Sequence, residues 1–491
     1  MAHKSSWREG QRLYAAGWLE AAGEQFKEAL EHARPDALLS ARIMDAMGRI
    51  AMQRNRHQDG IAWFRRAHNM IAHHDQKESL QFLFAITTRL NMALSLGTDE
   101  DRALRGLQRL EPQVASQPQR QQAIYHLNLG VVYLNAQLYP QGLVRLKSAQ
   151  DLITSEDMRE MSYPLHTNLG IALIALGRYE AARDELLVAL QLSSGKGLHA
   201  LNELTRLAIL MGDEDQVRTY GQQAIDQMWG SLMTFEKSEL ANLCEILAQV
   251  AVRTGETSLC RQLIDTAQTL YGQIGVWRHW RRLQKTPVAQ AGLPDTTLAP
   301  FIADIRRFLQ WLQMMLAQDI LHEKLPAVAD VRTQIAEAMA VAHQWDINRR
   351  RDLTLVSRLA DVGLTAIDYD VVHDPEKTPT TWMRYTAHPG LSLQLLASLK
   401  LPDEVMEAIG DHHEQPDGQG FPQGKTGPSI SPLAAVFGVA HAYTWNVVYL
   451  GIPHTRTLEL LKSRAPHQLP QDWVNTLVTI FDSVDLMVKA E

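Results

Sequence analysis

Small and apolar residues recur at fixed offsets through residues 1–283, and this internal repetition constrains the fold more than any other feature of the chain. The clearest copy spans Tyr163–Leu190, where Gly170 and Ala182 are small enough to let two helices cross closely. Leu186 and Ala189 would then fill the seam against the next pair of helices. The pattern therefore predicts a stack of helical pairs, an architecture that presents an extended binding surface to a partner.

Six further segments carry all or part of the same offsets, at intervals of about 35–43 residues. The offsets resemble those of the tetratricopeptide repeat, whose shortest period is about 34 residues. The longer period resembles that of bacterial regulators that bind signalling peptides. This resemblance implies six or seven repeats that bind a protein or peptide. The matching positions are Gly10, Gly17, Ala22, Phe26 and Ala29; Gly48, Gly60, Phe64 and Ala67; Asn91, Gly97 and Ala103; Gly130, Tyr133, Tyr139, Gly142, Leu146 and Ala149; Leu204, Gly212, Val217 and Ala224; and Ala248, Gly255, Cys260, Ile264 and Ala267.

Asparagine recurs near the crossing position of several copies. Asn128 and Asn168 both lie two residues before the crossing glycine, and Asn91 and Asn202 occupy similar stretches. Inside a helix, Asn costs about 0.5–0.7 kcal/mol relative to Ala, so its recurrence indicates a use. One hypothesis is that these amides line the groove of the repeats and pair with the backbone of an extended peptide. The alternative is that each amide bonds to the neighbouring repeat.

Charge and hydropathy exclude several classes of partner. The formal net charge is −7 and the pI is about 6.3, so no overall basic field favours nucleic acid or an anionic membrane. No segment approaches the roughly 18 apolar residues of a membrane helix, and the N-terminus lacks the apolar part of a secretory signal. Cys244 and Cys260 indicate neither a disulfide framework nor a metal knuckle. We expect a cytoplasmic protein, and homodimerisation stays open.

A polar segment separates the repeats from the rest of the chain. Residues 284–300 contain three prolines and one glycine, which is typical of a boundary between domains. From Phe301 an amphipathic helical pattern resumes, with Ile305, Phe308 and Leu312 on the same stripe. The sequence therefore predicts an all-α chain with a repeat domain at 1–283, a linker at 284–300 and a second helical domain at 301–491.

The second domain carries a pattern of imidazole and carboxylate residues around a glycine-rich loop. A His-Asp-type segment at 357–364, a His-Pro pair and a His-His-Glu triplet precede Asp-Gly-x-Gly-Phe-Pro. This order and spacing resemble the HD-GYP family, with phenylalanine in place of the family's tyrosine. The resemblance implies an all-helical domain and hydrolysis of cyclic di-GMP by two or three metal ions. The residues of the pattern are Asp361, His388, His412, His413, Glu414, Asp417, Gly418, Gly420, Phe421 and Pro422.

Several ligands that the resemblance implies are replaced in this chain. Ala360 stands where the family has the His of its His-Asp pair, and His441 stands where it has a later Asp ligand. Leu364 replaces a lysine, and His373 lies roughly where a phosphate-binding lysine is expected. The first His ligand is expected near residues 327–331, which contain neither His nor Glu. We therefore expect no complete centre of two or three ions.

The ligands that remain are Asp361, His388, His412 and His413, with His441 as a further candidate. Three imidazoles and one carboxylate can hold a single divalent ion such as Zn, Fe or Mn. The alternative is that local hydrogen bonds satisfy these side chains and the protein has no cofactor. The loop at 417–424 has the composition of a tight turn, which can shape a nucleotide pocket or a docking surface even without catalysis.

Three functions are consistent with this sequence. The first hypothesis is a non-enzymatic signalling protein, in which the repeats bind a peptide or protein and the degenerate HD-GYP-like domain is a docking or ligand-sensing module. The second is a metal-dependent cyclic di-GMP phosphodiesterase with a reduced metal site that the repeats regulate. The third is a receptor that binds cyclic di-GMP without cleaving it, a hypothesis that the replaced lysine positions weaken.

Overall fold

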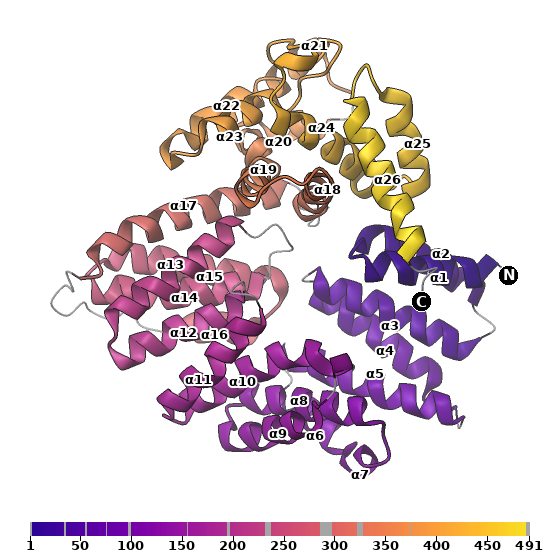
Figure 1. Ribbon diagram of the computed structural model, residues 1–491, viewed down its shortest axis with the longest axis vertical. Helices are drawn as coiled ribbons and strands as arrows, with labels where there is room; N and C mark the ends of the chain where they lie inside the picture. Colours follow the sequence, from indigo (N-terminus) through magenta and orange to yellow (C-terminus); the bar gives the residue numbers. More distant parts are fainter. Residues whose placement is uncertain are drawn as a thin grey trace.

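The protein folds almost entirely into helices in a computed structural model, as Figure 1 shows. The structure describes residues 2–33, 36–54, 56–74, 76–96, 100–154, 156–193, 197–230, 237–284, 297–321, 328–374 and 376–487. Within these ranges the β-type pairing consists of two isolated bridges, and no strand is formed. The predicted all-α fold is confirmed. None of the described helices is both long and apolar enough to cross a membrane.

The described part of residues 2–274 forms a repeat array in which consecutive helices pack as pairs. This arrangement confirms the predicted array of tetratricopeptide-type helical pairs. The pairs are α1 (Ala2–Ala15) with α2 (Leu19–Ala33), α3 (Ala37–Gln53) with α4 (His57–Ile71), α5 (Lys77–Ser95) with α6 (Glu100–Gln108), α8 (Gln119–Asn135) with α9 (Tyr139–Leu152), α10 (Ser162–Ala175) with α11 (Tyr179–Leu192), α12 (Leu198–Met211) with α13 (Glu214–Gly230), and α14 (Lys237–Arg253) with α15 (Thr257–Ile274). Short helices α7 (Glu111–Val114) and η1 (Glu156–Met161) lie between pairs.

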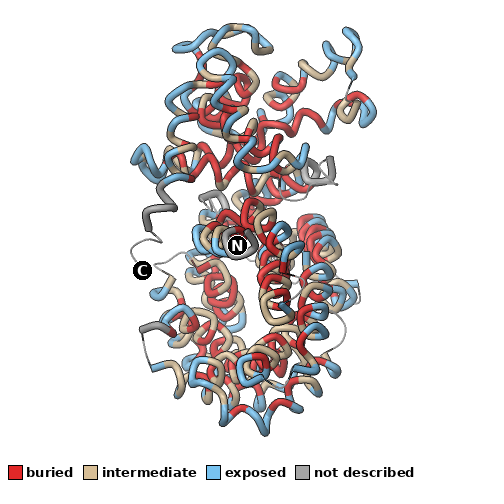
Figure 2. Tube along the Cα trace, turned by 90° about the vertical axis from the view of Figure 1, so that its right-hand side faces the viewer, coloured by how far each residue is buried: buried red, intermediate tan, exposed pale blue. Residues whose placement is uncertain are grey.

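The repeated glycines mark the points where the two helices of a pair touch. A β-carbon added at Gly48 would lie 2.5 Å from the ring of Phe64, and one added at Gly170 would lie 2.5 Å from Leu186. A larger residue at either position would push the helices apart, so the close crossing depends on glycine. Figure 2 shows the consequence, with buried residues concentrated on the faces that paired helices turn toward each other.

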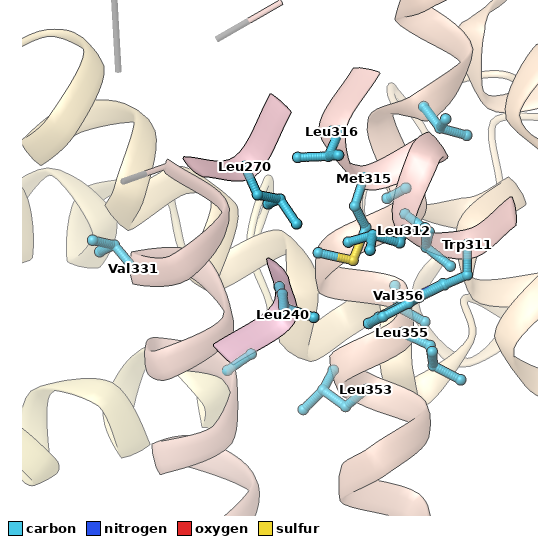
Figure 3. Close-up of a cluster of buried hydrophobic side chains, with 14 of the residues drawn as sticks. Leu240, Leu270, Trp311, Leu312, Met315, Leu316, Val331, Leu353, Leu355 and Val356 are labelled. Atoms are coloured by element: carbon cyan, nitrogen blue, oxygen red, sulfur yellow. The ribbon is translucent and has the colours of Figure 1, made fainter. Parts of the chain in front are cut away.

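Helix α17 (Ala299–Leu321) joins the repeats to the second half of the chain. It follows α16 (Trp277–Gln284), and most of the predicted linker at 284–300 lies outside the described residues. One continuous hydrophobic core includes Leu240 of α14, Leu312 of α17 and Leu355 of α19, as Figure 3 shows. The repeats and the second domain therefore share a core through α17.

The second domain is a cluster of helices around α24. This helix packs against α18, α19, α23, α25 and α26. The elements are α18 (Val328–Ala342), α19 (Ile347–Leu359), η2 (Ala360–Ala366), α20 (Tyr369–His373), α21 (Pro379–Tyr385), α22 (His388–Leu396), η3 (Ala397–Leu399), α23 (Asp403–Asp411), η4 (Gly427–Ser429), α24 (Pro432–Thr444), η5 (Trp445–Tyr449), α25 (His454–Arg464) and α26 (Gln471–Met487).

The second domain contacts both ends of the repeat array, so the molecule closes into a ring (Figure 1). At one end, α17 packs against α13 and α15. At the other, the ring of Trp18 lies 4.8 Å from that of Phe481 in α26. The backbone N–H of His454 also donates to Glu24 Oε2 at 3.1 Å, and Gln334 donates to the carbonyl oxygen of Gly17.

Candidate metal centre and adjoining cavity

Four of the side chains predicted from the sequence converge in the second domain. Asp361 of η2, His388 at the start of α22, and His412 and His413 after α23 each offer one ligand atom, and these atoms lie within 4.8 Å of one another. Asp361, His388 and His412 are buried, and His413 is half-buried. The structure therefore assembles, from three separate elements, a donor set of three imidazoles and one carboxylate.

Close contact between η2 and α22 brings Asp361 opposite His388. A β-carbon at Gly363 would lie 2.2 Å from the carbonyl oxygen of His388, so only glycine allows this approach. Ser392 stabilises the contact between η2 and α22. Its hydroxyl accepts from the N–H of Gly363 at 2.8 Å and donates to the carbonyl of Ala360 at 2.6 Å. Neither Gly363 nor Ser392 was recognised from the sequence, since their role depends on a contact between distant segments.

Hydrogen bonds fix the tautomers of two of the imidazoles. His388 Nδ1 lies 2.7 Å from the carbonyl of Tyr385, and His412 Nδ1 lies 2.6 Å from that of Ile409. A carbonyl only accepts, so each Nδ1 donates, and each neutral ring keeps its lone pair on Nε2. These two Nε2 atoms face each other at 2.9 Å, and Asp361 Oδ1 lies 3.8 and 3.5 Å from them. Two opposed lone pairs beside a carboxylate are what a bound cation requires.

Burial favours the neutral, ligating form of His388 and His413. Burial lowers the pKa of His388 to about 4, and the neighbouring His412 acts in the same direction. Burial and His412 likewise lower the pKa of His413 well below its usual range. The Nε2 atom of His413 is buried and has no hydrogen-bond partner among the described residues. The donor set thus fits one divalent transition ion, which when bound would polarise a phosphate oxygen or acidify a water molecule.

Arg332 of α18 occupies the other side of Asp361. The guanidinium is wholly buried and pairs with Asp361 Oδ2, while Oδ1 faces the histidines. Burial alone would raise the pKa of Asp361, but the Arg332 charge acts in the opposite direction together with His412 and His441. Their combined effect holds the pKa of this carboxyl well below its usual range. The segment in which a first ligand was expected, residues 327–331, ends one residue before Arg332. A cation at a core-facing helix position was the signal that could have identified it.

His441 of α24 lies beside the four-residue cluster and not within it. Its Nδ1 atom is 3.3 Å from Arg332 Nη1, and its ring stacks on Phe437 at 5.5 Å. The imidazole also forms part of the wall of the adjoining cavity. His441 is therefore not one of the four clustered ligand candidates, and its Nδ1 contacts the guanidinium of Arg332 instead.

The signature loop supports His413. Phe421 stacks on the His413 ring with centroids 4.5 Å apart, and the two residues form an isolated antiparallel bridge. Glu414 closes the loop by accepting from the backbone N–H groups of Gln423 and Lys425 at 2.7 and 2.8 Å. The remaining loop residues shape the turn: Asp417 Oδ1 accepts from the N–H of Gln419, Gly418 has a φ of +78°, and the Phe421–Pro422 peptide bond is cis.

A cavity of about 450 Å³ adjoins the cluster. His412, His413 and His441 form part of its wall, so a ligand in the cavity would lie against the imidazoles. The cavity is also lined by four aromatic side chains and two cationic ones, which are Trp382, Tyr385, Phe421, Trp445, Lys377 and Arg464. The ammonium of Lys377, four residues after His373, lies 4.8 Å above the Tyr385 ring.

The inner face of the repeat array forms a second, larger cavity of about 610 Å³. Asn128 and Asn168 line it, together with apolar side chains of α8 and α10. Asn91 and Asn202 do not, because both amides are buried between helices. Asn91 donates to the carbonyl of Thr87 at 2.8 Å, and Asn202 donates to that of Glu239 at 3.1 Å. Of the four amides expected in the groove, two therefore line this cavity, while Asn202 bonds to the neighbouring repeat and Asn91 bonds within its own helix.

The fold and the donor set define a helical repeat protein that ends in a helical domain with a candidate metal centre. Residues 315–449, most of the second domain, match the model of the HD domain family. A curated relative is 3′3′-cGAMP-specific phosphodiesterase 3 of Vibrio cholerae, 24% identical over 208 residues. The match covers 40% of this chain and 43% of the relative, so the chain spans less than half the length of that protein.

Several solved structures match part of this chain. A tetratricopeptide repeat protein from Parabacteroides merdae is 14% identical, with 58% of this chain and 99% of that chain covered and a TM-score of 0.37. The apo form of the quorum sensor NprR from B. thuringiensis is 14% identical, with 58% and 85% covered and a TM-score of 0.42. An HDG"Y"P protein from Bdellovibrio bacteriovorus is 16% identical, with 55% and 81% covered and a TM-score of 0.28.

Proposed function

We propose that this chain is a cytoplasmic signalling protein whose HD domain binds one divalent transition-metal ion and senses a cyclic dinucleotide without cleaving it. The observation that carries the proposal is the opposed pair of Nε2 atoms of His388 and His412, 2.9 Å apart beside Asp361. Both rings are held in the ligating tautomer by backbone carbonyls, as in metal sites whose ligands are oriented by outer hydrogen bonds.

The cavity beside this site has the chemistry of a nucleotide pocket. Trp382, Tyr385 and Trp445 offer faces on which bases can stack. Lys377 and Arg464 supply the positive charge that phosphates require. The proposed lack of cleavage rests on the replaced residues, because Ala360 and Leu364 offer no donor where the HD-GYP pattern has His and Lys. A single ion cannot clamp both the attacking and the leaving oxygen in the way that two ions do.

The repeat groove is the proposed site for a peptide or protein partner. Asn128 and Asn168 are half-buried on its wall, where their amides can pair with an extended backbone. Apolar residues of the same wall, including Val131 and Ile171, would accept alternate side chains of the peptide. The double variant Asn128→Ala and Asn168→Ala should lose the partner that wild-type protein retains in a pull-down. Exposed Asn475→Ala is the matched control, and equal retention by all three proteins would contradict the groove as the binding site.

Elemental analysis of the purified full-length protein tests the metal site. We expect about one Mn, Fe or Zn per chain in wild-type protein and loss of that ion in His412→Ala. His467→Ala is the matched control, because this imidazole is exposed and distant from the ligand cluster in sequence. Fewer than about 0.2 bound ions per wild-type chain would contradict the metal site, since a preformed site with these donors binds tightly.

Calorimetry with cyclic di-GMP and with 3′3′-cGAMP tests the sensing role. We expect binding without turnover, and Trp445→Ala should weaken it about 5- to 150-fold if one base stacks on this ring. Exposed Trp277→Ala of the repeats is the control and should leave affinity unchanged. Neither ligand binding to wild-type protein loaded with Mn²⁺ would contradict this part of the proposal.

A second candidate function is a phosphodiesterase that works with a single ion. It is favoured by His412 and His413 reaching the cavity wall, which would place an ion within reach of a bound phosphate. Product formation from either cyclic dinucleotide, dependent on Mn²⁺ or Fe²⁺ and absent in His412→Ala, would establish this function in place of the sensing role.

A further inference from the structure

Arg332 is the most completely enclosed charged side chain near the candidate metal centre. Its exposed fraction is 0%, and its guanidinium is held from several directions at once. Nε donates to the carbonyl of Ser357 at 2.9 Å, and the group lies 4.8 Å above the Phe437 ring. A side chain fixed in this way belongs to the architecture of the site and is not a surface arginine that happens to reach it.

A single nitrogen of this guanidinium lies between two potential metal donors. Nη1 pairs with Asp361 Oδ2 and lies 3.3 Å from His441 Nδ1. A carboxylate and an imidazole that face one common point would be the first two donors of an additional metal site. Here that point holds an N–H donor with a permanent positive charge, because arginine is not deprotonated in proteins.

The two oxygens of Asp361 consequently face two different cations, which are the proposed metal ion and the guanidinium of Arg332. Oδ1 lies 3.5 Å from His412 Nε2 on the side of the proposed ion, and Oδ2 lies on the side of Arg332. In a two-ion site, a single carboxylate can bridge both metals through its two oxygens. In this protein the guanidinium of Arg332 is hydrogen-bonded to Oδ2.

We propose that Arg332 Nη1 occupies the position of a second metal ion and limits the HD domain to one ion per chain. The inference rests on the proposed one-ion site. The charge of Arg332 repels a second dication, and its hydrogen bonds occupy the two donors that such an ion would need. Arg332 is a positioning residue, since it holds Asp361 and His441 and does not line the cavity.

Metal stoichiometry of the full-length protein tests this inference. Metal-free wild type, Arg332→His, Arg332→Gln and Arg332→Lys are saturated with millimolar Mn²⁺ and desalted, and the ions per chain are counted by elemental analysis. Electron paramagnetic resonance shows whether two ions are coupled, as expected for metals about 3.5–4 Å apart. The matched control is Arg358→His, because Arg358 is similarly buried in α19 and pairs with Asp330 of α18.

We expect one ion with an uncoupled spectrum in wild type, Arg332→Lys and Arg358→His. Arg332→His supplies a third donor and should bind two coupled ions, and Arg332→Gln should bind a second ion more weakly. Two ions in wild type would overturn the inference alone. One ion in both Arg332→His and Arg332→Gln would also overturn it, provided that each variant unfolds cooperatively. No ion in any of the proteins would overturn the proposed metal site and the inference with it.

Discussion

Gly420 lies where the signature loop passes closest to its own backbone. A β-carbon at this position would lie 2.4 Å from the backbone nitrogen of Gln415 and 2.5 Å from the carbonyl oxygen of His413. Gly420→Ala must therefore move the loop, which separates Phe421 from the His413 ring on which it stacks. We expect a loss of about 1–3 kcal/mol in the free energy of unfolding, measured in denaturant, together with weaker binding of metal.

A glycine with free space beside it provides the control for that substitution. Gly390 lies in α22 near His388, and an added β-carbon there would meet nothing within 4 Å. Gly390→Ala should leave metal binding unchanged and raise stability by about 0.5–1 kcal/mol, because alanine favours the helix. Equal stabilities of the two variants would show that the Gly420 contact does not hold the loop.

At the scale of single residues, the sequence predicted which side chains converge better than it predicted their surroundings. Asp361, His388, His412 and His413 belong to a short pattern with fixed order, so their convergence could be inferred from one chain. Arg332 and Lys377 act through contacts with residues that lie elsewhere in the sequence. Such contacts depend on how α18 and the segment after α20 pack, and periodicity within one segment carries no information about them.

Among the helical elements, the pair α10 and α11 provides the sharpest test of the repeat geometry. The pair crosses at Gly170, where a β-carbon would lie 2.5 Å from the fully buried side chain of Leu186. Gly170→Val should destabilise the protein by about 1–3 kcal/mol, because a well-packed core accepts extra carbon atoms only by shifting the helices. Thermal and denaturant unfolding measure the loss. Ala181→Val on the exposed face of α11 is the control, and a similar loss in both variants would contradict the role of the crossing.

The same repeats show why the helical pairs were easier to predict than the groove residues. Each crossing glycine lies at a contact between the two helices of one pair, so the spacing of these glycines can be recognised within a single stretch of sequence. Whether an asparagine faces the groove or a neighbouring helix depends on the rotation of each helix in the array. That rotation differs between copies, since Asn128 and Asn168 line the cavity while Asn91 and Asn202 are buried.

At the scale of the whole molecule, the contact between Trp18 and Phe481 closes the ring. Both side chains are buried, and they join the first repeat to the last helix of the HD domain. Trp18→Ala should weaken this contact and let the first repeat move away from α26. We expect a larger radius of gyration by small-angle X-ray scattering and faster hydrogen exchange in α25 and α26. Exposed Trp277→Ala is the control, and unchanged scattering in Trp18→Ala would show that other contacts close the ring.

His454 makes the same junction sensitive to pH. The imidazole lies between the first repeat and the HD domain, 4.3 Å from the Phe481 ring, and its Nδ1 lies 2.8 Å from the Tyr443 hydroxyl. Burial lowers the pKa of His454 from 6.5 to about 4, with Glu9 and Asp482 opposing the shift and Arg12 reinforcing it. Between these values the unfolded chain binds a proton that the folded chain does not. The stability that neutral His454 contributes is therefore present above pH 6.5 and lost as the pH falls toward 4.

Acidification should consequently loosen the ring through this one side chain. Between pH 7 and pH 5 we expect wild type to lose about 1–2 kcal/mol more of its free energy of unfolding than His454→Gln does. Glu24, whose pKa is raised by burial, acts in the opposite direction, but it is present in both proteins and cancels in the comparison. Denaturant unfolding at several pH values measures the difference, and exposed His467→Gln should follow wild type. If wild type and His454→Gln lose the same free energy of unfolding between pH 7 and pH 5, His454 does not make the junction sensitive to pH.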